Sequence, residues 1–359
     1  MKGLLLAGGH GTRLRPLTFT GNKHMLPIAN RPMLFYGLEH LRDAGVTEVA
    51  IILGPLKEGI AEQIGDGSAF GLKVTYLVQG EPKGLAHAVL CARDFLGDEP
   101  FLMYLGDNLL EQGARPYLDR FAKGDASAVV GAVPVKEPFH YGVVELGSDG
   151  ESIISIEEKP KAPKSNLALI GVYLFTPAIH DIIKDLKPSA RGELEITDAI
   201  WALHKATHKV RVIKLEGWWK DTGQPADLLE ANERVLASRP KSFFQILGEV
   251  HPKAHVSGHV AIGEGSVIGA DSTVRGPAVI GRNVRLEGGA LIGPYTAVGD
   301  GTTVRRAEVD RSIIMENVVI DAPLRIVDSI VGKSAKISER TRLPRGQSFI
   351  IGDASQVLL

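Results

Sequence analysis

Cysteine is almost absent from this chain of 359 residues, in which Cys91 is the single example. One thiol excludes an internal disulfide and any metal site built from several cysteines. Cys91 falls in an apolar segment that we predict to be helical. We therefore interpret it as a buried structural thiol and not as a nucleophile.

Net charge and long apolar runs are also missing. Lys and Arg number 41 and Asp and Glu number 42, which gives a formal net charge of −1. Without a large basic field, we expect neither nucleic acid nor a membrane surface as a partner, so a few placed residues must hold any bound anion. No apolar stretch is long enough to cross a bilayer, and Met1 leads directly into the first predicted strand without room for a signal peptide. We therefore expect a cytoplasmic protein.

What the chain has is a glycine-rich loop directly after its first apolar run. Residues 2–16 read KGLLLAGGHGTRLRP, where a run of strand length precedes Gly8, Gly9, Gly11 and Arg13. Glycine lets successive backbone N–H groups turn toward one anion, and arginine adds a fixed fork of donors. The loop fits neither Gly-x-x-x-x-Gly-Lys-Ser/Thr nor Gly-x-Gly-x-x-Gly. On its glycines alone, an ordinary strand-to-helix turn is the better interpretation.

The first part of the chain alternates short apolar runs with amphipathic segments. This pattern predicts strands at 3–7, 48–53, 73–78 and 101–105, and helices at 33–44, 57–64 and 85–95. Such alternation favours a parallel sheet that is covered on both faces, with ligands beyond the carboxyl ends of the strands. From residue 128 to 175 the sequence favours strands over helices, and we expect strands at 128–135, 143–146, 153–157 and 167–175.

Several of these predicted strands end in charged residues. Asp107 follows an apolar strand and a glycine, a position that suits Mg²⁺, although a turn aspartate that caps its own backbone is as good an interpretation. Glu158 and Lys159 stand before a proline and offer an acceptor for sugar hydroxyls and a cation for a phosphate. A solvated charged turn is the alternative. Asp221, in Trp-Lys-Asp-Thr-Gly, again ends a strand.

Two further segments complete the first part of the chain. The stretch 189–198, which contains Arg-Gly-Glu-Leu-Glu at 191–195, is expected to open a helix that reaches about residue 205. Acidic residues in a first helical turn are ordinary partners of the helix dipole. After a strand at 209–215, a helix at 225–237 closes the domain, and 238–240 is the expected hinge.

Beyond the hinge, aliphatic residues recur at every sixth position. They are Val250, Val256, Ile262, Ile268, Val274, Ile280, Leu286, Ile292, Val298 and Val304. Small residues recur at a second phase, at Ser266, Ser272, Ala278, Ala290, Thr296 and Thr302. A period of six predicts hexapeptide repeats that coil into a parallel β-helix. Asp310 breaks the phase, which we expect to resume at Ile314, Ile320 and Ile326 and to shift again at Val331, Ile337 and Leu343.

Together these motifs resemble a known family. Gly8-Gly9-x-Gly11-Thr12-Arg13-Leu14, followed by Lys23, is similar to the signature of the sugar-phosphate nucleotidylyltransferases, and within them to the long form of the glucose-1-phosphate thymidylyltransferases. The resemblance extends to about residue 236. It implies an α/β fold, with a Rossmann-like mixed sheet in a nucleotidyltransferase domain at 1–240, followed by a left-handed parallel β-helix at 241–359.

The resemblance also implies an activity and a set of site residues. The reaction would be the Mg²⁺-dependent, in-line transfer of a nucleotidyl group from dTTP to glucose 1-phosphate, which gives dTDP-glucose and pyrophosphate. The family pattern places nucleotide contacts at Leu6, Gly8, Gly9, Gly11, Thr12, Arg13, Gln79 and Gly84, and sugar-phosphate contacts at Gly142, Glu158, Lys159, Leu169 and Glu193. It implies Asp107 and Asp221 as metal ligands, and Arg13, Lys23, Lys159 and Asp107 as catalytic residues.

The sequence leaves the base, the role of the β-helix and the catalytic activity open to more than one interpretation. His24 stands where thymidylyltransferases often have a base-contacting glutamine, which leaves UTP possible beside dTTP, and we favour a nucleotide-site role for it. Many β-helices of this kind are acyltransferases, and a bifunctional uridylyltransferase and acetyltransferase is the second interpretation. The β-helix has histidines only on its opening turns, at His251, His255 and His259, so we favour a role in homo-oligomer assembly or regulation. A non-catalytic sugar-nucleotide sensor is the third.

Overall fold

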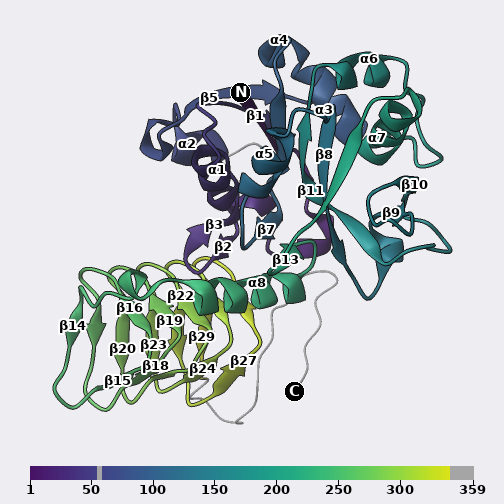
Figure 1. Cartoon of the computed structure of the whole chain (residues 1–359). Helices are drawn as coiled ribbons and strands as arrows, with labels where there is room; N and C mark the ends of the chain where they lie inside the picture. Colours follow the sequence, from purple (N-terminus) through teal and green to yellow (C-terminus); the bar gives the residue numbers. More distant parts are fainter. Residues whose placement is uncertain (55–58, 340–359) are drawn as a thin grey trace. The chain divides into compact units, whose positions relative to one another are not determined.

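The structure is a computed structural model that describes residues 1–54 and 59–339 (Figure 1). It divides into two compact units. The first contains Met1–Gly11, Gly21–Met25 and Met33–Asp221, and the second contains Thr12–Thr20, Leu26–Pro32 and the chain from Thr222 onward. Two short N-terminal segments therefore belong with the C-terminal part of the chain. The division of the sequence near residue 240 stays a prediction.

The first unit combines strands with short helices. Its strands are β1 Lys2–Ala7, β4 Glu48–Leu53, β5 Lys73–Val78, β6 Phe101–Leu105, β7 Asn108–Leu110, β8 Ala128–Pro134, β9 Gly142–Leu146, β10 Ile153–Glu158, β11 Leu167–Phe175, β12 Val210–Lys214 and β13 Trp219–Asp221. Its helices are α1 Met33–Asp43, α2 Ile60–Ile64, α3 Leu85–Cys91, α4 Arg93–Leu96, α5 Arg115–Phe121, α6 Ala178–Lys184 and α7 Ile196–Lys205. The 3-10 turns are η2 Lys23–Met25, η3 Ser68–Phe70 and η4 Pro138–His140.

The main sheet is mixed, as the family resemblance implied. Its order is β10-β9-β11-β6-β1-β4-β5, and β8 lies between β11 and β12. The strands β6, β1, β4 and β5 are parallel, whereas β11 runs antiparallel to β6. The alternation of strands and helices in the first part of the chain therefore predicts the parallel half correctly. The antiparallel half comes from the β-rich stretch, which lacks crossover helices.

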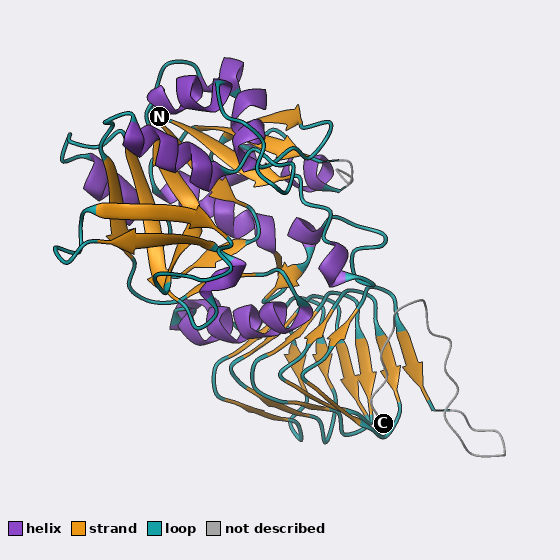
Figure 2. Ribbon diagram, turned by 90° about the vertical axis from the view of Figure 1, so that its right-hand side faces the viewer, coloured by secondary structure: helices purple, strands orange, loops and turns teal. Residues whose placement is uncertain are grey.

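Both faces of the central strands β1, β4 and β6 are buried, which explains why these strands are continuous apolar runs. Leu4 and Leu6 of β1 pack with α3, α4, α6 and α7, while Leu5 and Ala7 pack with α1, α2 and α5 on the opposite face. Figure 2 shows the helices lying against the strands. None of the helices in the described part of the chain is long and apolar enough to span a membrane.

Some element boundaries differ from those expected from the sequence. The helix expected at 85–95 is interrupted at Ala92, which separates α3 from α4. The helix expected to open within 189–198 begins only at Ile196, because the residues before it form turns. Of the helix expected at 57–64, the described part is Ile60–Ile64, and residues 57 and 58 lie outside the described residues.

The second unit contains a hairpin, a long helix and a β-helix. Its first elements are η1 Thr12–Leu14, β2 Pro27–Ile28, β3 Arg31–Pro32, α8 Pro225–Ser238 and η5 Lys241–Phe243. The β-helix strands are β14 Glu249–Val250, β15 His255–Ser257, β16 Val260–Ile262, β17 Val267–Ile268, β18 Thr273–Arg275, β19 Ala278–Ile280, β20 Arg285–Glu287, β21 Leu291–Ile292, β22 Thr296–Val298, β23 Thr303–Arg305, β24 Glu308–Asp310, β25 Ile313–Ile314, β26 Val319–Asp321, β27 Arg325–Val327, β28 Ile330–Val331 and β29 Lys336–Ser338.

The hexapeptide period produces the β-helix that the sequence predicted. Its strands form three parallel sheets, and in the first of them Val250, Ile268, Leu286 and Val304 stack on one another at intervals of 18 residues. Three hexads therefore make one turn. The aliphatic residues of successive turns form one continuous core. Its left-handedness stays a prediction from the family resemblance.

The phase break near Asp310 is a shortening of the β-helix turn. Val309 pairs with Ile292, one residue earlier than the period requires, and Ile314 pairs with Val298. Val309 thus enters the core, while Asp310 stays partly exposed. The expected return of the phase at Ile314, Ile320 and Ile326 is correct, because all three are buried. Leu343 lies outside the described residues.

Candidate functional site

The glycine-rich loop and Asp107 meet at one edge of the sheet in the first unit. The neighbouring parallel strands β1 and β6 pair Leu6 with Leu105, so the residues that follow each strand leave the sheet side by side. Gly8 and Gly9 follow β1, and Asp107 follows β6. This edge is where parallel sheets bind ligands.

Lys23 and Asp107 form an ion pair at this edge. The ammonium of Lys23 contacts Oδ2 of Asp107, and their side chains are only 14% and 18% exposed. Burial alone would raise the pKa of Asp107, but the charge of Lys23 and the hydrogen bonds from Lys23 and Asn108 hold it well below its usual value. Asp107 is therefore ionised at neutral pH. A Cβ on Gly9 would stand 2.8 Å from Cε of Lys23, so a glycine is needed there for Lys23 to lie across the loop.

His24 lies beneath the loop as a neutral imidazole. Burial, with a contribution from the charge of Lys23, lowers its pKa to about 3. Its Nδ1 lies 2.7 Å from Oδ1 of Asn22, whose Nδ2 donates to the carbonyl of Ala7. Since Oδ1 can only accept, Nδ1 carries the proton. His24 is thus a fixed wall of the site and carries no charge of its own.

Asp221 comes close to Asp107 through strand pairing. In the small antiparallel sheet, β13 pairs with β7 so that Asp221 stands opposite Asn108, the residue after Asp107. Two carboxylates at neighbouring positions, one of them held ionised, fit a Mg²⁺ ion, which takes one or two protein carboxylates and completes its shell with water and phosphate. Among the described residues, no group of three or more His, Cys, Asp or Glu side chains offers a cage for a metal.

The polar edge of the site is formed by Gln79 and Gly84. Nε2 of Gln79 donates to the carbonyl of Gly84 at 3.1 Å and to Nδ1 of His87 at 2.9 Å. Burial, and then the charge of Lys83, lowers the pKa of His87, in agreement with an acceptor nitrogen. Because Nε2 makes these two hydrogen bonds, Oε1 is the end of the Gln79 amide that faces Gly8. It lies 3.6 Å from the position that a Cβ on Gly8 would occupy.

These residues enclose one pocket. It has a volume of about 220 Å³ and is apolar on the side of Ile52, Leu85 and Ala88. Its lining includes nine of the residues singled out in the sequence: Leu6, Gly8, Gly9, Lys23, His24, Gln79, Gly84, Asp107 and Glu193.

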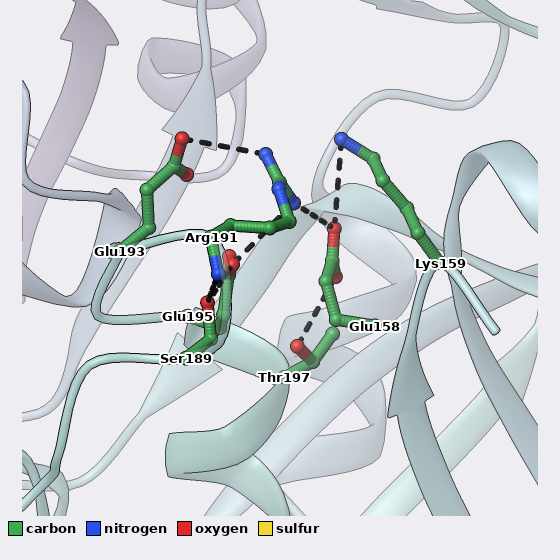
Figure 3. A network of polar contacts seen from close by, with 7 residues as sticks. All are labelled: Glu158, Lys159, Ser189, Arg191, Glu193, Glu195 and Thr197. Atoms are coloured by element: carbon green, nitrogen blue, oxygen red, sulfur yellow. Dashed lines mark hydrogen bonds and ion pairs between the residues drawn. The ribbon is translucent and has the colours of Figure 1, made fainter.

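A network of polar contacts adjoins the pocket at Glu193 (Figure 3). The guanidinium of Arg191 contacts Oε1 of Glu158 at 3.4 Å and Oε1 of Glu193 at 3.3 Å. Lys159 reaches the same oxygen of Glu158 at 3.8 Å, so that two cations converge on one carboxylate, as Figure 3 shows. Thr197 donates to the other oxygen of Glu158 at 3.1 Å. The network therefore offers both acceptors and cations to a phosphorylated polyol.

The backbone holds this network in place beside the pocket. Glu158 pairs with Gly142 across β10 and β9, where a Cβ on Gly142 would collide with the methyl group of Thr197. Lys159 adopts φ +44, and its N–H donates to the carbonyl of Tyr141 at 3.0 Å. The N–H of Leu194 donates to the carbonyl of Lys83 at 2.8 Å, so the loop of Arg191 is tied to the loop of Gln79 and Gly84.

Other residues singled out in the sequence are not among those that line the pocket. Leu169 is buried in β11 and does not line the pocket. Gly11 ends the first segment of the first unit, whereas Thr12 and Arg13 belong to the second unit. Cys91 is partly buried with a raised pKa, chiefly because of desolvation, in agreement with a structural thiol.

Four residues of the site were not expected from the sequence. Arg191 and Thr197 contact Glu158, and Asn108 donates a hydrogen bond to Asp107, the residue before it in the chain. Trp219 hydrogen-bonds to Asn108 from β13. Arg191 could have been found from its place in the Arg-Gly-Glu-Leu-Glu run. Thr197, Asn108 and Trp219 carry no sequence signal, because their roles depend on contacts across strands and loops.

A glycine-rich loop, a lysine and an aspartate at the edge of a mixed sheet, with a second aspartate on a neighbouring strand pair, are typical of nucleotide-dependent phosphoryl chemistry. The chain belongs to the nucleotidyl transferase family: the family described as "Nucleotidyl transferase" matches residues 2–238, and the family described as "GMPPB C-terminal domain" matches residues 274–358. The chain is thus a sugar-1-phosphate nucleotidyltransferase enzyme with a GMPPB-like C-terminal domain.

Full-length relatives carry two kinds of name. The chain is 44% identical to the low-salt glycan biosynthesis nucleotidyltransferase Agl11 of Haloferax volcanii, over 100% of both chains. It is 43% identical to a glucose-1-phosphate thymidylyltransferase of Streptomyces griseus, over 99% of both. A solved structure of UDP-glucose pyrophosphorylase with UDP-glucose is 30% identical, with a TM-score of 0.59 over 66% of this chain and 99% of that chain.

Proposed function

We propose that this enzyme transfers a thymidylyl group from dTTP to glucose 1-phosphate and releases pyrophosphate. The observation that supports it best is the pocket of about 220 Å³, in which the ion pair of Lys23 and Asp107 faces the amide of Gln79, with Glu193 leading to the network of Glu158 and Lys159. One site thus offers a polar edge for a base, charges for phosphates and acceptors for sugar hydroxyls.

In the proposed reaction, an oxygen of the sugar phosphate attacks the α-phosphorus of the nucleotide. The new O–P bond forms as the bond to the β-phosphate breaks, and pyrophosphate leaves with the electron pair. The attacking oxygen is already ionised, so no general base is required. Catalysis then depends on bringing two anions together and neutralising their charge.

Residues from separate segments of the chain share this work. Lys23 would contact the α-phosphate as negative charge develops there, and Lys159 would bind the phosphate of the sugar. Arg191, which shares the carboxylate of Glu158 with Lys159, would add a second cation. Glu158 and Glu193 would accept hydrogen bonds from the hexose hydroxyls. From the family resemblance, Arg13 would contact the pyrophosphate.

Asp107 and Asp221 would hold a Mg²⁺ ion, which when bound supplies charge neutralisation between the reacting phosphates. The low pKa of Asp107 supports this assignment, because a metal ligand must be deprotonated.

The orientation of Gln79 bears on the choice of base. Its Oε1 accepts, and so pairs with the N3–H of thymine or uracil but not with N3 of cytosine, which is itself an acceptor. This contact does not separate dTTP from UTP, so UTP is the second candidate donor. The apolar wall of Ile52, Leu85 and Ala88 offers a place for the thymine methyl group, which supports dTTP.

A pyrophosphate-release assay tests the proposal. Each of dTTP, UTP, dCTP and ATP is combined with glucose 1-phosphate, glucosamine 1-phosphate and mannose 1-phosphate in Mg²⁺, and a further arm measures consumption of acetyl-coenzyme A. We expect dTTP with glucose 1-phosphate to give the highest kcat/KM, and dCTP to be poor. A maximum with a purine nucleotide would contradict the proposal, and consumption of acetyl-coenzyme A would establish the bifunctional alternative.

A further inference from the structure

Asn108 is a buried amide whose orientation is fixed by its neighbours. It begins β7 and is 4% exposed. Its Oδ1 accepts from the N–H of Gly171 at 3.0 Å and from Nε1 of Trp219 at 2.7 Å, and its Nδ2 donates to Oδ1 of Asp107 at 3.0 Å. Because two N–H groups point at the same oxygen, the amide cannot flip without losing both hydrogen bonds.

The close approach of β11 makes this arrangement possible. A Cβ on Gly171 would stand 2.7 Å from Cγ of Asn108, so a larger residue there would push the amide away from Asp107. Asn108 therefore lies in a slot that fits it, and one carboxylate oxygen of Asp107 is held by its amide while Oδ2 points toward Lys23.

Trp219 connects this amide to the other parts of the site. It stands two residues before Asp221 in β13, and its ring meets that of Tyr141 edge-on with centroids 5.4 Å apart. The carbonyl of Tyr141 accepts from the N–H of Lys159. The contacts thus run from Asp107 through Asn108 and Trp219 to the peptide that carries Lys159.

We propose that Asn108 and Trp219 are positioning residues, which orient the carboxylate of Asp107 for the divalent cation of the proposed reaction. This rests on the proposed function. A carboxylate that is already oriented loses less conformational freedom when it binds a cation, and partners of metal ligands commonly change metal affinity about 10–100-fold when they are replaced. The expected effect is therefore on metal affinity more than on folding.

The test removes one hydrogen bond and leaves the rest of the slot intact. Replacing Asn108 leaves two buried N–H groups without an acceptor and risks misfolding. Trp219→Phe instead removes the indole N–H together with part of the ring volume, and keeps an aromatic ring against Tyr141. Trp218→Phe is the matched control, because its buried Nε1 has no hydrogen-bond partner among the described residues.

The readout is the binding of Mn²⁺, which like Mg²⁺ suits carboxylate and water ligands. The free Mn²⁺ signal is followed by electron paramagnetic resonance with full-length protein and dTTP, without sugar phosphate, so that no turnover occurs. We expect Trp219→Phe to weaken Mn²⁺ binding about 3–10-fold, somewhat less than for a direct partner of the ligand. Trp218→Phe should bind as the unaltered protein does. Thermal unfolding in a chelator should separate the two variants by only a few degrees.

The positioning role is overturned if Trp219→Phe and Trp218→Phe bind Mn²⁺ equally tightly, or if Trp219→Phe lowers the unfolding temperature without any change in Mn²⁺ affinity. Asp107→Asn distinguishes this failure from that of the metal assignment. If Asp107→Asn binds Mn²⁺ as the unaltered protein does, the assignment in the proposed function is wrong.

Discussion

At the scale of the residue, the site is controlled by how side chains from distant segments fix each other's charge and orientation. Lys23 and Asp107 are 84 positions apart and form an ion pair, in which the charge of Lys23 lowers the pKa of Asp107. Arg191 and Lys159 share the carboxylate of Glu158. Since these charges are partly shielded from solvent, each substitution removes a partner as well as a contact.

If Lys159 binds the sugar phosphate as proposed, its replacement should selectively weaken the binding of glucose 1-phosphate. Lys159→Met keeps the length of the side chain but removes the ammonium, so we expect kcat/KM for glucose 1-phosphate to fall about 100-fold, the scale of one lost charge-assisted contact. The KM for dTTP should change little. Lys161→Met, an exposed lysine two residues away, is the control. Equal losses in both variants would show that Lys159 has no specific role.

The buried imidazole of His180 should make the stability of the protein depend on pH. It lies in α6, stacked on Phe101 with centroids 5.5 Å apart, and among the described residues neither ring nitrogen has a hydrogen-bond partner. Burial, and then the charge of Arg93, lowers its pKa below the ordinary 6.5. In the unfolded chain the imidazole takes up a proton near pH 6.5, whereas in the folded chain it resists protonation. The free energy of unfolding should therefore keep its full value above about pH 6.5 and decrease as the pH falls below it.

His180→Phe should remove this contribution. We expect the variant to gain about 1–2 kcal/mol near neutral pH, because two buried nitrogens without partners disappear. Its free energy of unfolding should also depend less on pH between 6.5 and 5. Urea unfolding at several pH values measures both. His204→Phe, on α7 and stacked on Trp201, is the control, and an equal flattening in both variants would refute the assignment.

How much of the site could be predicted from the sequence depends on the residue. Asp107 could be chosen because it follows a predicted strand of a parallel sheet, where functional groups gather. Glu158, Lys159 and Asp221 stood out as charged residues at strand ends, but their roles came from the family resemblance. Asn108 and Trp219 could not, because their roles depend on the register of β13 on β7. No local pattern encodes that register, which joins segments more than 100 residues apart.

At the scale of the element, a two-residue hairpin is bound tightly within the second unit. The turn between β2 and β3 has Ala29 and Asn30 at positive φ, as a type I′ hairpin turn requires. Asn232 of α8 accepts from the N–H of Ala29 at 2.9 Å and donates to the carbonyl of Tyr295 at 2.8 Å. One buried amide thus joins the hairpin, the helix and a β-helix turn.

Asn232→Ala should destabilise the second unit. The substitution leaves a buried N–H and a buried carbonyl without their partner, which predicts a loss of about 2–4 kcal/mol. Chemical denaturation followed by circular dichroism measures it. Glu233→Ala, the exposed neighbour on α8, should cost less than about 0.5 kcal/mol. If both variants unfold at the same denaturant concentration, the amide does not join these elements.

The elements themselves were easier to predict than their boundaries. The bounds of β4, β5, β6 and β11 agree with the predicted strands. For β4, β6 and β11 the reason is that buried strands consist of continuous hydrophobic residues. The helix break at Ala92 was not expected, since nothing in the local sequence forbids a helix there. The shortened turn that brings Val309 into the core was seen in the sequence only as a break of phase.

At the scale of the whole molecule, the repeat period and the motifs together account for a nucleotidyltransferase fold with a β-helix. What the β-helix does for the enzyme stays a prediction. Its opening turns expose Ile246 and Leu247, which are 53% and 57% accessible in the chain alone. Repeat proteins need a capped or covered end.

We therefore expect the protein to form a homo-oligomer. Small-angle X-ray scattering, or light scattering after size exclusion, should give a mass that is a multiple of 38.5 kDa. Dilution should lower this mass only at concentrations far below those at which the enzyme is assayed. A stable monomer over the whole range would count against assembly as the role of the β-helix.

The central claim is that Asp107 and Asp221 act together in transferring a nucleotidyl group to a sugar phosphate. The most direct measurement is pyrophosphate release from dTTP and glucose 1-phosphate in Mg²⁺, for the unaltered protein and for Asp107→Asn and Asp221→Asn, with circular dichroism to show that both variants are folded. We expect robust release by the unaltered protein and a loss of at least about 100-fold in each folded variant. Near-normal release by either variant would contradict it.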